Sequence, residues 1–240
     1  MNTKLFFIRK IKALFLRMNL HVIFLPFWGL FINLAYLSKL SKWRKEIPKL
    51  PFDDFYNNKV NYGDRFKLHS FVAANENLNG AINYFEFGVA DGVSLKWWVS
   101  NNKNQDSRFY GFDTFTGLPE DFGVMKKNDY DTKGNFPDIK DPRCSFIAGM
   151  FQDSMPGFFK DFHFTKRSIF HMDADLYSST LYVLTFLAYR FKKDDIIIFD
   201  EFGVPTHEFR AFNDFISSYQ LKFQYLGAIN NYLQVAIKII

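Results

Sequence analysis

The strongest constraint on the fold of this chain is the alternation of short apolar runs with segments of helical pattern between residues 83 and 218. Each apolar run has four to six residues, as expected for a strand that is buried on both faces of a sheet. The predicted strands are 83–88, 108–112, 145–148, 168–172 and 195–199. The predicted helices are 64–78, 93–100, 154–161, 177–191 and 207–218. This alternation predicts an α/β fold with a mostly parallel sheet and helices on both faces.

Two further regions of the chain depart from this alternation. Residues 222–227 and 231–238 are strand patterns with only a short turn between them, which predicts a C-terminal antiparallel hairpin and a seven-stranded sheet. Residues 114–143 connect two predicted strands and contain six glycines and prolines. Because long loops inside compact domains are usually lids or binding loops, we expect loop 114–143 to form a lid over one end of the sheet.

The charge of the chain is unevenly distributed. Residues 1–50 contain ten lysines and arginines and one acid, Glu46, whereas the other 190 residues hold 20 basic and 24 acidic side chains. A nucleic-acid enzyme usually carries its positive field on the folded body, so no nucleic-acid partner is expected. Cys144 is the single cysteine, which excludes an intrachain disulfide and fits a cytoplasmic protein.

The N-terminal segment, residues 1–50, is basic and apolar, and residues 46–62 have the composition of a linker to a domain at 51–240. Residues 4–18 predict an amphipathic helix of the kind that lies on an anionic membrane surface. Residues 20–37 have no lysine, arginine, aspartate or glutamate, but this stretch is borderline in length for a membrane-spanning helix. Two interpretations stay open. Residues 1–40 contact the inner face of a membrane peripherally, or these helices cover the domain or form the dimer interface of a homo-oligomer.

Carboxylates follow the apolar runs at the points where the predicted strands end: Glu86, Asp113, Asp173 and the pair Asp200 and Glu201. In an open parallel sheet, ligands bind beyond the C-terminal ends of the strands. These acids therefore converge on one negative pocket, which suits a cationic ligand and a hard metal ion. The pattern favours a methyl donor that carries a sulfonium over a phosphate-rich dinucleotide.

The first predicted strand turns through Gly88 and Gly92 into a helix that contains Ser94, and the glycines allow the backbone to approach a ligand closely. The dinucleotide fingerprint requires a third, central glycine, which this turn lacks. Asp91 would lie near the helix N-terminus, where it would repel a pyrophosphate. S-adenosylmethionine has no phosphate. Asp113, at the end of the next strand, has the position of an acid that accepts the ribose hydroxyls of such a cofactor.

Three carboxylates at adjacent strand ends, Asp173, Asp200 and Glu201, cannot all be buried and ionised without a counter-charge. A divalent ion supplies that charge, and oxygen ligands without a Cys/His cluster favour Mg²⁺ or Ca²⁺ over Zn²⁺. Asp175 is either a reserve ligand or a helix cap. His207 and His171 are candidates for a general base, since histidine titrates near neutral pH.

The motifs Glu86–Val89, Gly111–Glu120, His171–Thr180 and Phe199–Glu201 together resemble the S-adenosylmethionine-dependent O-methyltransferases of the macrocin/mycinamicin type, which are related to catechol O-methyltransferase. The resemblance covers the chain from about Asp64 onward. It implies a Rossmann-like class I methyltransferase fold and transfer of a methyl group to a sugar hydroxyl. The family usually has two aspartates where this chain has Asp200 and Glu201.

The resemblance also implies roles for individual residues. Glu86, Gly88 and Ser94 would contact the methionine part of the donor, Gly92 would line its turn, Asp113 would hold the ribose, and Gln152 would lie beside the adenine. Asp173, Asp200 and Glu201 would be the magnesium ligands. Separately from the resemblance, Asp173 and His207 are predicted to act in catalysis, His207 because histidine titrates near neutral pH.

The function predicted from the sequence is therefore a Mg²⁺-dependent O-methyltransferase that acts on a small-molecule or lipid-linked glycan. Two alternatives are a non-catalytic membrane-associated protein on a methyltransferase fold and another Rossmann-type nucleotide enzyme.

Overall fold

The computed structural model describes residues 3–240, and the chain divides into two compact units, Met1–Glu46 and Ile47–Ile240. The division lies four residues before the boundary predicted between residues 50 and 51.

The part of the first unit that the structure describes is helical except for the turn at residues 18–20. It contains α1 (Thr3–Arg17), α2 (His21–Phe24), the 3₁₀ turn η1 (Leu25–Phe27) and α3 (Trp28–Glu46). None of these four elements has a buried residue. Residues His21–Glu46 are long and apolar enough to cross a membrane, by length and composition alone. The ring of Phe15 stacks on that of Phe24 at 5.6 Å between centroids, which joins α1 to α2.

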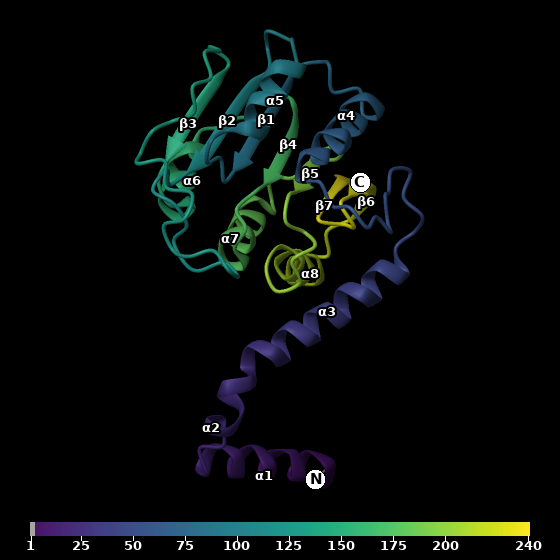
Figure 1. Cartoon of the computed structure of the whole chain (residues 1–240), viewed down its shortest axis with the longest axis vertical. Coiled ribbons are helices and arrows are strands. Elements are labelled where there is room, and N and C mark those ends of the chain that lie inside the picture. The colour runs from purple at the N-terminus through teal and green to yellow at the C-terminus, as the bar shows by residue number, and fades with distance from the viewer. Residues whose placement is uncertain (1–2) are drawn as a thin grey trace. The chain divides into compact units, whose positions relative to one another are not determined.

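The second unit is built on a seven-stranded sheet with the strand order β3-β2-β1-β4-β5-β7-β6 (Figure 1). The strands are β1 (Ile82–Phe87), β2 (Arg108–Asp113), β3 (Cys144–Ala148), β4 (Arg167–Met172), β5 (Ile196–Phe199), β6 (Phe223–Ile229) and β7 (Gln234–Ile239). The first five are parallel, and β7 runs antiparallel to both β5 and β6. This topology confirms the predicted fold class, including the C-terminal antiparallel hairpin.

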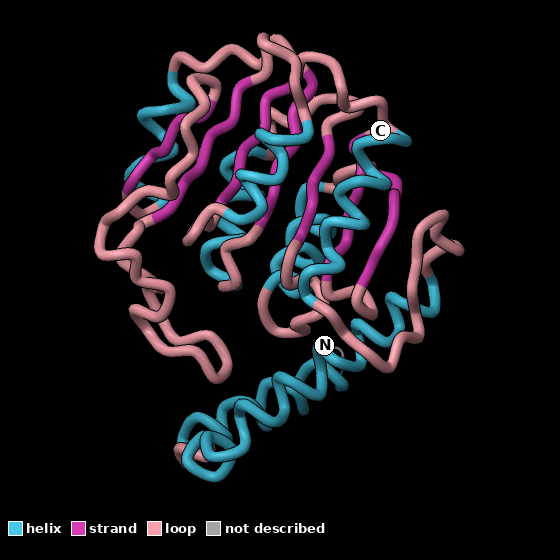
Figure 2. The backbone as a smooth tube through the Cα atoms, turned by 45° about the horizontal axis from the view of Figure 1, so that its top comes forward, coloured by secondary structure: helices cyan, strands magenta, loops and turns pink. Residues whose placement is uncertain are grey.

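Helices cover both faces of the sheet, because successive side chains of a strand point to opposite faces (Figure 2). The helices are α4 (Arg65–Asn75), α5 (Val93–Asn101), α6 (Phe151–Lys160), α7 (Tyr177–Leu187) and α8 (Glu208–Tyr219). Tyr84 of β1 packs against Trp98 of α5 at 5.3 Å between ring centroids, in a cluster that includes part of α4. The next residue, Phe85, packs against Phe159 of α6 at 5.5 Å.

Residues 52–64, which we name the strap, are attached to the turn between β6 and β7. The backbone N–H of Ala228 donates to the carbonyl of Phe52 at 2.8 Å. The Asp54 carboxylate accepts from the backbone N–H groups of Asn230 and Asn231 at 3.0 and 3.1 Å. The prediction of a linker is therefore wrong from residue 52 onward. Its Asp and Asn residues are typical of loops, but here they bind a turn that lies far away in the sequence.

The strap ends in the 3₁₀ turn η2 (Tyr62–Asp64), which leads directly into α4. Asn61 holds this turn from both sides, because its side chain accepts from the N–H of Gly63 and its own N–H donates to the side chain of Asn230. The position of Tyr62 and Arg65 is thus determined by the β6–β7 turn.

Candidate active site

A cavity of about 440 Å³ opens at the C-terminal ends of β1, β2, β4 and β5. Loop 114–143 contributes to its wall through Leu118, Pro119, Phe122, Met125 and Tyr130, among others. The predicted site residues in the wall are Glu86, Gly88, Ser94, Asp113, Gln152, Asp173 and Glu201. Asp91 and Asp175 line it as well, whereas Gly92, Asp200 and His207 do not. Most of the predicted site therefore surrounds one cavity.

Gly88 is required by close packing between two strand ends. Its φ is +92°, and a Cβ at this position would lie 1.8 Å from the carbonyl oxygen of Asp173. The residue after β1 therefore touches the backbone after β4. Gly92, with φ +69°, instead faces Pro137, whose Cβ and Cγ a side chain would meet at 2.7 Å. Its role in this structure is to let loop 114–143 pack against the start of α5.

Asp113 organises the turn between β1 and α5. Its Oδ2 accepts from the backbone N–H groups of Val89 at 2.6 Å and Ala90 at 2.9 Å, and its Oδ1 accepts from that of Phe115 at 2.8 Å. Charge-assisted bonds of this type are short and strong. The acid at the end of β2 thus connects the β1 turn to loop 114–143, while its side chain also faces the cavity.

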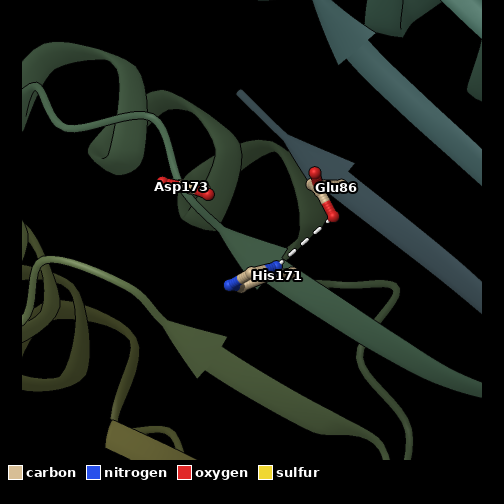
Figure 3. A group of neighbouring side chains, drawn as sticks. All are labelled: Glu86, His171 and Asp173. Atoms are coloured by element: carbon tan, nitrogen blue, oxygen red, sulfur yellow. Dashed lines mark ion pairs between the residues drawn. The ribbon is translucent and has the colours of Figure 1, made fainter. Parts of the chain in front are cut away.

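A buried group of acids and a histidine joins β1 to β4 (Figure 3). Figure 3 shows Glu86 on β1, His171 on the neighbouring strand and Asp173 just beyond that strand's end. The Oε2 of Glu86 lies 3.5 Å from the Nδ1 of His171, and the hydroxyl of Tyr84 lies 2.8 Å from the same nitrogen. Burial lowers the pKa of His171, but Asp200 and Glu86 outweigh it and raise this pKa to about 10. His171 is fully buried and is not among the residues that line the cavity, so its ring does not face a bound acceptor.

Asp200 is fully buried and already has a cationic partner. Its Oδ2 lies 2.8 Å from the guanidinium of Arg65 and accepts a second hydrogen bond from the hydroxyl of Tyr62. The same hydroxyl lies 2.7 Å from Oε1 of Glu201. Burial raises the pKa of Asp200, but His171, Arg65 and Tyr62 together bring it down to about 2.

Three other acids at this end of the sheet are compensated less than Asp200. Burial outweighs the effect of His171, which lowers the pKa of Asp173. It also outweighs the effect of the Tyr62 hydroxyl, which lowers the pKa of Glu201. Burial, followed by the neighbouring carboxylates, raises the pKa of Asp173 well above its usual value. Burial likewise raises the pKa of Asp175 and of Glu201 to about 7. The cluster therefore holds more acid than the protein's own cations neutralise.

The donor set is chemically suited to a hard divalent ion, although the three predicted ligands are not gathered at metal-binding distance. Within residues 3–240, the group whose ligand atoms lie within 4.8 Å of one another is Glu86, His171 and Asp173. The buried Oδ1 of Asp200 has no hydrogen-bond partner in this part of the chain. That oxygen lies 3.7 Å from Nε2 of His171, so the excess acid at Asp173 and Glu201 is what fits a cation with oxygen ligands.

His207 lies directly before α8, outside the cavity wall. Its ring packs against Phe122 of loop 114–143 at 4.8 Å between centroids, and its Nδ1 accepts a long hydrogen bond of 3.4 Å from the N–H of Tyr177. Burial lowers its pKa, so it is neutral at pH 7, as a base requires. Phe122, however, separates it from the cavity.

Tyr62 and Arg65 are cavity residues that the sequence analysis did not identify. Both lie in or next to a segment whose composition resembles a linker. One sequence feature points to Arg65. A buried acid such as Asp200 requires a cation, and Arg65 is the last arginine before β1.

Comparison with known proteins identifies the family. The macrocin O-methyltransferase (TylF) family matches residues 68–231. The calicheamicin methyltransferase CalS11 has a similar structure, with a TM-score of 0.59 and 18% sequence identity over 85% of this chain and 91% of that one. The O-methyltransferase NovP is similar with a TM-score of 0.54 and 18% identity over 74% of this chain and 78% of that one.

A search of curated proteins gave no match. At 18% identity, the two solved structures show the class I methyltransferase fold alone. The family match extends over most of the chain and includes each of the four motifs that suggested the resemblance. The chain therefore belongs to the macrocin O-methyltransferase (TylF) family and is an S-adenosylmethionine-dependent O-methyltransferase.

Proposed function

We propose that the protein transfers a methyl group from S-adenosylmethionine to a hydroxyl of a sugar, either in a natural product or in a glycan, with Mg²⁺ bound at the acidic end of the cavity. The observation that carries the proposal is the excess of buried acid at the ends of β4 and β5, next to a turn suited to a cationic donor. Family membership supports an enzyme over the two alternatives, a non-catalytic protein and a different nucleotide enzyme.

The donor side of the cavity is proposed to consist of residues from three turns. Glu86 supplies negative charge for the ammonium of the donor, and Asp113 accepts from its ribose hydroxyls. The hydroxyl of Ser94 is buried and has no hydrogen-bond partner within the described residues, so it is available to the methionine part. Gly88 and Gly92 shape the turn. Gln152, at the start of α6, lies in the wall where the adenine is proposed to bind.

The acceptor side is proposed to contain Asp173, Asp200 and Glu201 as ligands of Mg²⁺, with Asp175 beside them. When bound, the ion lowers the pKa of the attacking hydroxyl and orients it. The residues themselves provide an acidic wall that places the acceptor against the donor, so positioning contributes much of the rate. His207 is proposed to accept the hydroxyl proton, and this requires movement of Phe122 and its loop.

Calorimetry on the purified full chain tests the proposal. S-adenosylhomocysteine is expected to bind, because its ammonium and ribose meet Glu86 and Asp113, whereas NAD is expected not to bind, because Asp91 repels its pyrophosphate. Incubation of extracts with labelled S-adenosylmethionine should then yield a labelled sugar. Binding of NAD without binding of S-adenosylhomocysteine would refute the proposed donor.

We further propose that residues 1–40 bind the surface of an anionic membrane and that the acceptor is a lipid-linked glycan at its inner face. Large apolar side chains of α1 are exposed, including Phe7, Ile11 and Leu14, each more than half accessible. Lysines and arginines alternate with them along the helix. Exposed apolar groups flanked by positive charge complement acyl chains beneath anionic headgroups.

Sedimentation with lipid vesicles tests this contact. The full chain is expected to bind vesicles that contain phosphatidylserine, and the double variant Phe7→Ser/Ile11→Ser is expected to lose most of that binding. The control Lys160→Gln removes a charge from α6, in the other unit, and should bind as the wild type does. If the variant instead changes the size of the protein in the absence of vesicles, the helices form a homo-oligomer interface and the membrane proposal is wrong.

A further inference from the structure

Two side chains already contact the carboxylates at the acidic end of the cavity, Tyr62 of the strap and Arg65 of α4. Arg65 lies 2.8 Å from Oδ2 of Asp200, and the hydroxyl of Tyr62 bonds to both Asp200 and Glu201. The guanidinium carbon of Arg65 also lies 4.5 Å from the centre of the Tyr62 ring, so the two side chains support each other. We name this pair the clasp.

The clasp neutralises only part of the local charge. Among the described residues, the ion pairs of this cluster join Arg65 to Asp200 and join His171 to Glu86 and Asp200. Asp173, Asp175 and Glu201 take part in none of the ion pairs within this part of the chain. The guanidinium of Arg65 therefore pairs with Asp200 alone and, within residues 3–240, leaves these three acids without an ion pair.

The two clasp residues lie in consecutive elements of the chain. Arg65 is the first residue of α4, and Tyr62 lies in the turn before it. The strap is held against β6 and the β6–β7 turn by hydrogen bonds of Phe52, Asp54, Asn57 and Asn61. Release of Asp200 would therefore free the side chains of Tyr62 and Arg65 from the acids while the strand ends stay in place.

We propose that Arg65 and a divalent cation compete for Asp200, so that the clasp must open when the metal binds. This inference rests on the proposed function. The Oδ2 of Asp200 already has two donors, and a guanidinium and a divalent ion within about 4 Å of one carboxylate repel each other. Arg65 and Tyr62 are positioning residues in this scheme. They hold the acids in an ordered, partly neutralised state until the ion replaces them.

Binding of Mn²⁺ to the full chain, followed by electron paramagnetic resonance in the presence of S-adenosylhomocysteine, tests the competition. The variant Arg65→Met is expected to bind Mn²⁺ about tenfold more tightly than the wild type, because the competing charge is gone. Tyr62→Phe is expected to show a smaller increase in the same direction. The matched control is Lys67→Met, on the same helix, whose amine pairs with Asp64 outside the cavity and whose loss should leave the affinity unchanged.

Hydrogen exchange gives a second readout that does not depend on activity. Addition of Mn²⁺ to the wild type is expected to speed exchange of the strap amides, because the clasp has released Asp200. If Arg65→Met does not fold, the Mn²⁺ affinity of Tyr62→Phe and the exchange of the wild-type strap amides test the competition instead. No gain in affinity and no faster exchange would contradict it.

Three results would overturn the proposal. Equal or weaker Mn²⁺ binding by Arg65→Met would show that Arg65 does not compete with the ion. If neither protein binds Mn²⁺ while both bind S-adenosylhomocysteine, Arg65 is the permanent counter-charge, and the clasp hypothesis fails together with the proposed Mg²⁺ site while the proposed donor stands. If S-adenosylhomocysteine does not bind either, the proposed function fails together with it.

Discussion

Replacing Asp173 with asparagine is expected to lower turnover by roughly a thousandfold while the affinity for S-adenosylhomocysteine changes far less, because a metal at a developing alkoxide supplies several kcal/mol and each 1.4 kcal/mol is tenfold. Asp173 follows β4 in the cavity wall, and the burial that raises its pKa marks a carboxylate without a cation. Asparagine keeps the shape but removes the charge that would hold Mg²⁺. Single-turnover assays of the two proteins measure the difference.

Chelation provides the matched control for this experiment. Treatment of the wild type with EDTA should abolish turnover, and added Mg²⁺ should restore it, whereas Mg²⁺ should not rescue Asp173→Asn. Full turnover of the wild type in chelator would show that the acids serve another purpose. The same assay with His207→Ala examines the base, since unchanged turnover would remove His207 from the mechanism.

Replacing Asp113 with alanine is expected to weaken binding of S-adenosylhomocysteine by about 100-fold or more, because a hydrogen bond to a charged group contributes about 1.5–3 kcal/mol. The loss has two sources. The proposed ribose contact disappears, and the N–H groups of Val89, Ala90 and Phe115 lose their acceptor. The turn after β1 should therefore become disordered, so we also expect a lower melting temperature. Calorimetry and thermal unfolding measure the two effects.

Asp106→Ala is the control for this variant. Asp106 is an exposed aspartate in the connection before β2, at the other end of the strand from Asp113. The Asp106→Ala variant should bind S-adenosylhomocysteine and unfold as the wild type does. Wild-type affinity in Asp113→Ala would mean that the donor does not use the end of β2, and the proposed orientation of the cofactor would then be wrong.

The sheet was predictable because each buried parallel strand needs its own continuous apolar run. The run at 83–88 corresponds to strand Ile82–Phe87, and the run at 195–199 corresponds to Ile196–Phe199. Each end of these two strands lies within one residue of its predicted position. The hairpin was predictable for a related reason, since too few residues separate its strands to form a crossover helix. The local hydrophobic pattern therefore predicted the strands, the parallel arrangement and the terminal hairpin.

The strap and the clasp were not predictable, because they depend on contacts between distant parts of the chain. Tyr62 and Asp200 are 138 residues apart, and nothing near either residue indicates the pairing. The Asp and Asn residues of the strap have the composition of a loop whether they are solvated or bound to another turn. The predicted metal ligands lie at one end of the sheet, and their role stays a prediction; the sequence does not reveal that Arg65 already pairs with Asp200.

The contact between Gly88 and the backbone of Asp173 has a consequence for how such an enzyme diversifies. A hydrogen bond from the N–H of Asp173 to the carbonyl of Phe87 holds the same two strand ends, and one from the N–H of Gly88 to the carbonyl of Phe112 joins β1 to β2. In the proposed arrangement the methyl donor and its target lie at these two strand ends, so the main chain rather than a side chain sets their spacing. An exchange of the surrounding loops would then admit a different acceptor without changing that spacing.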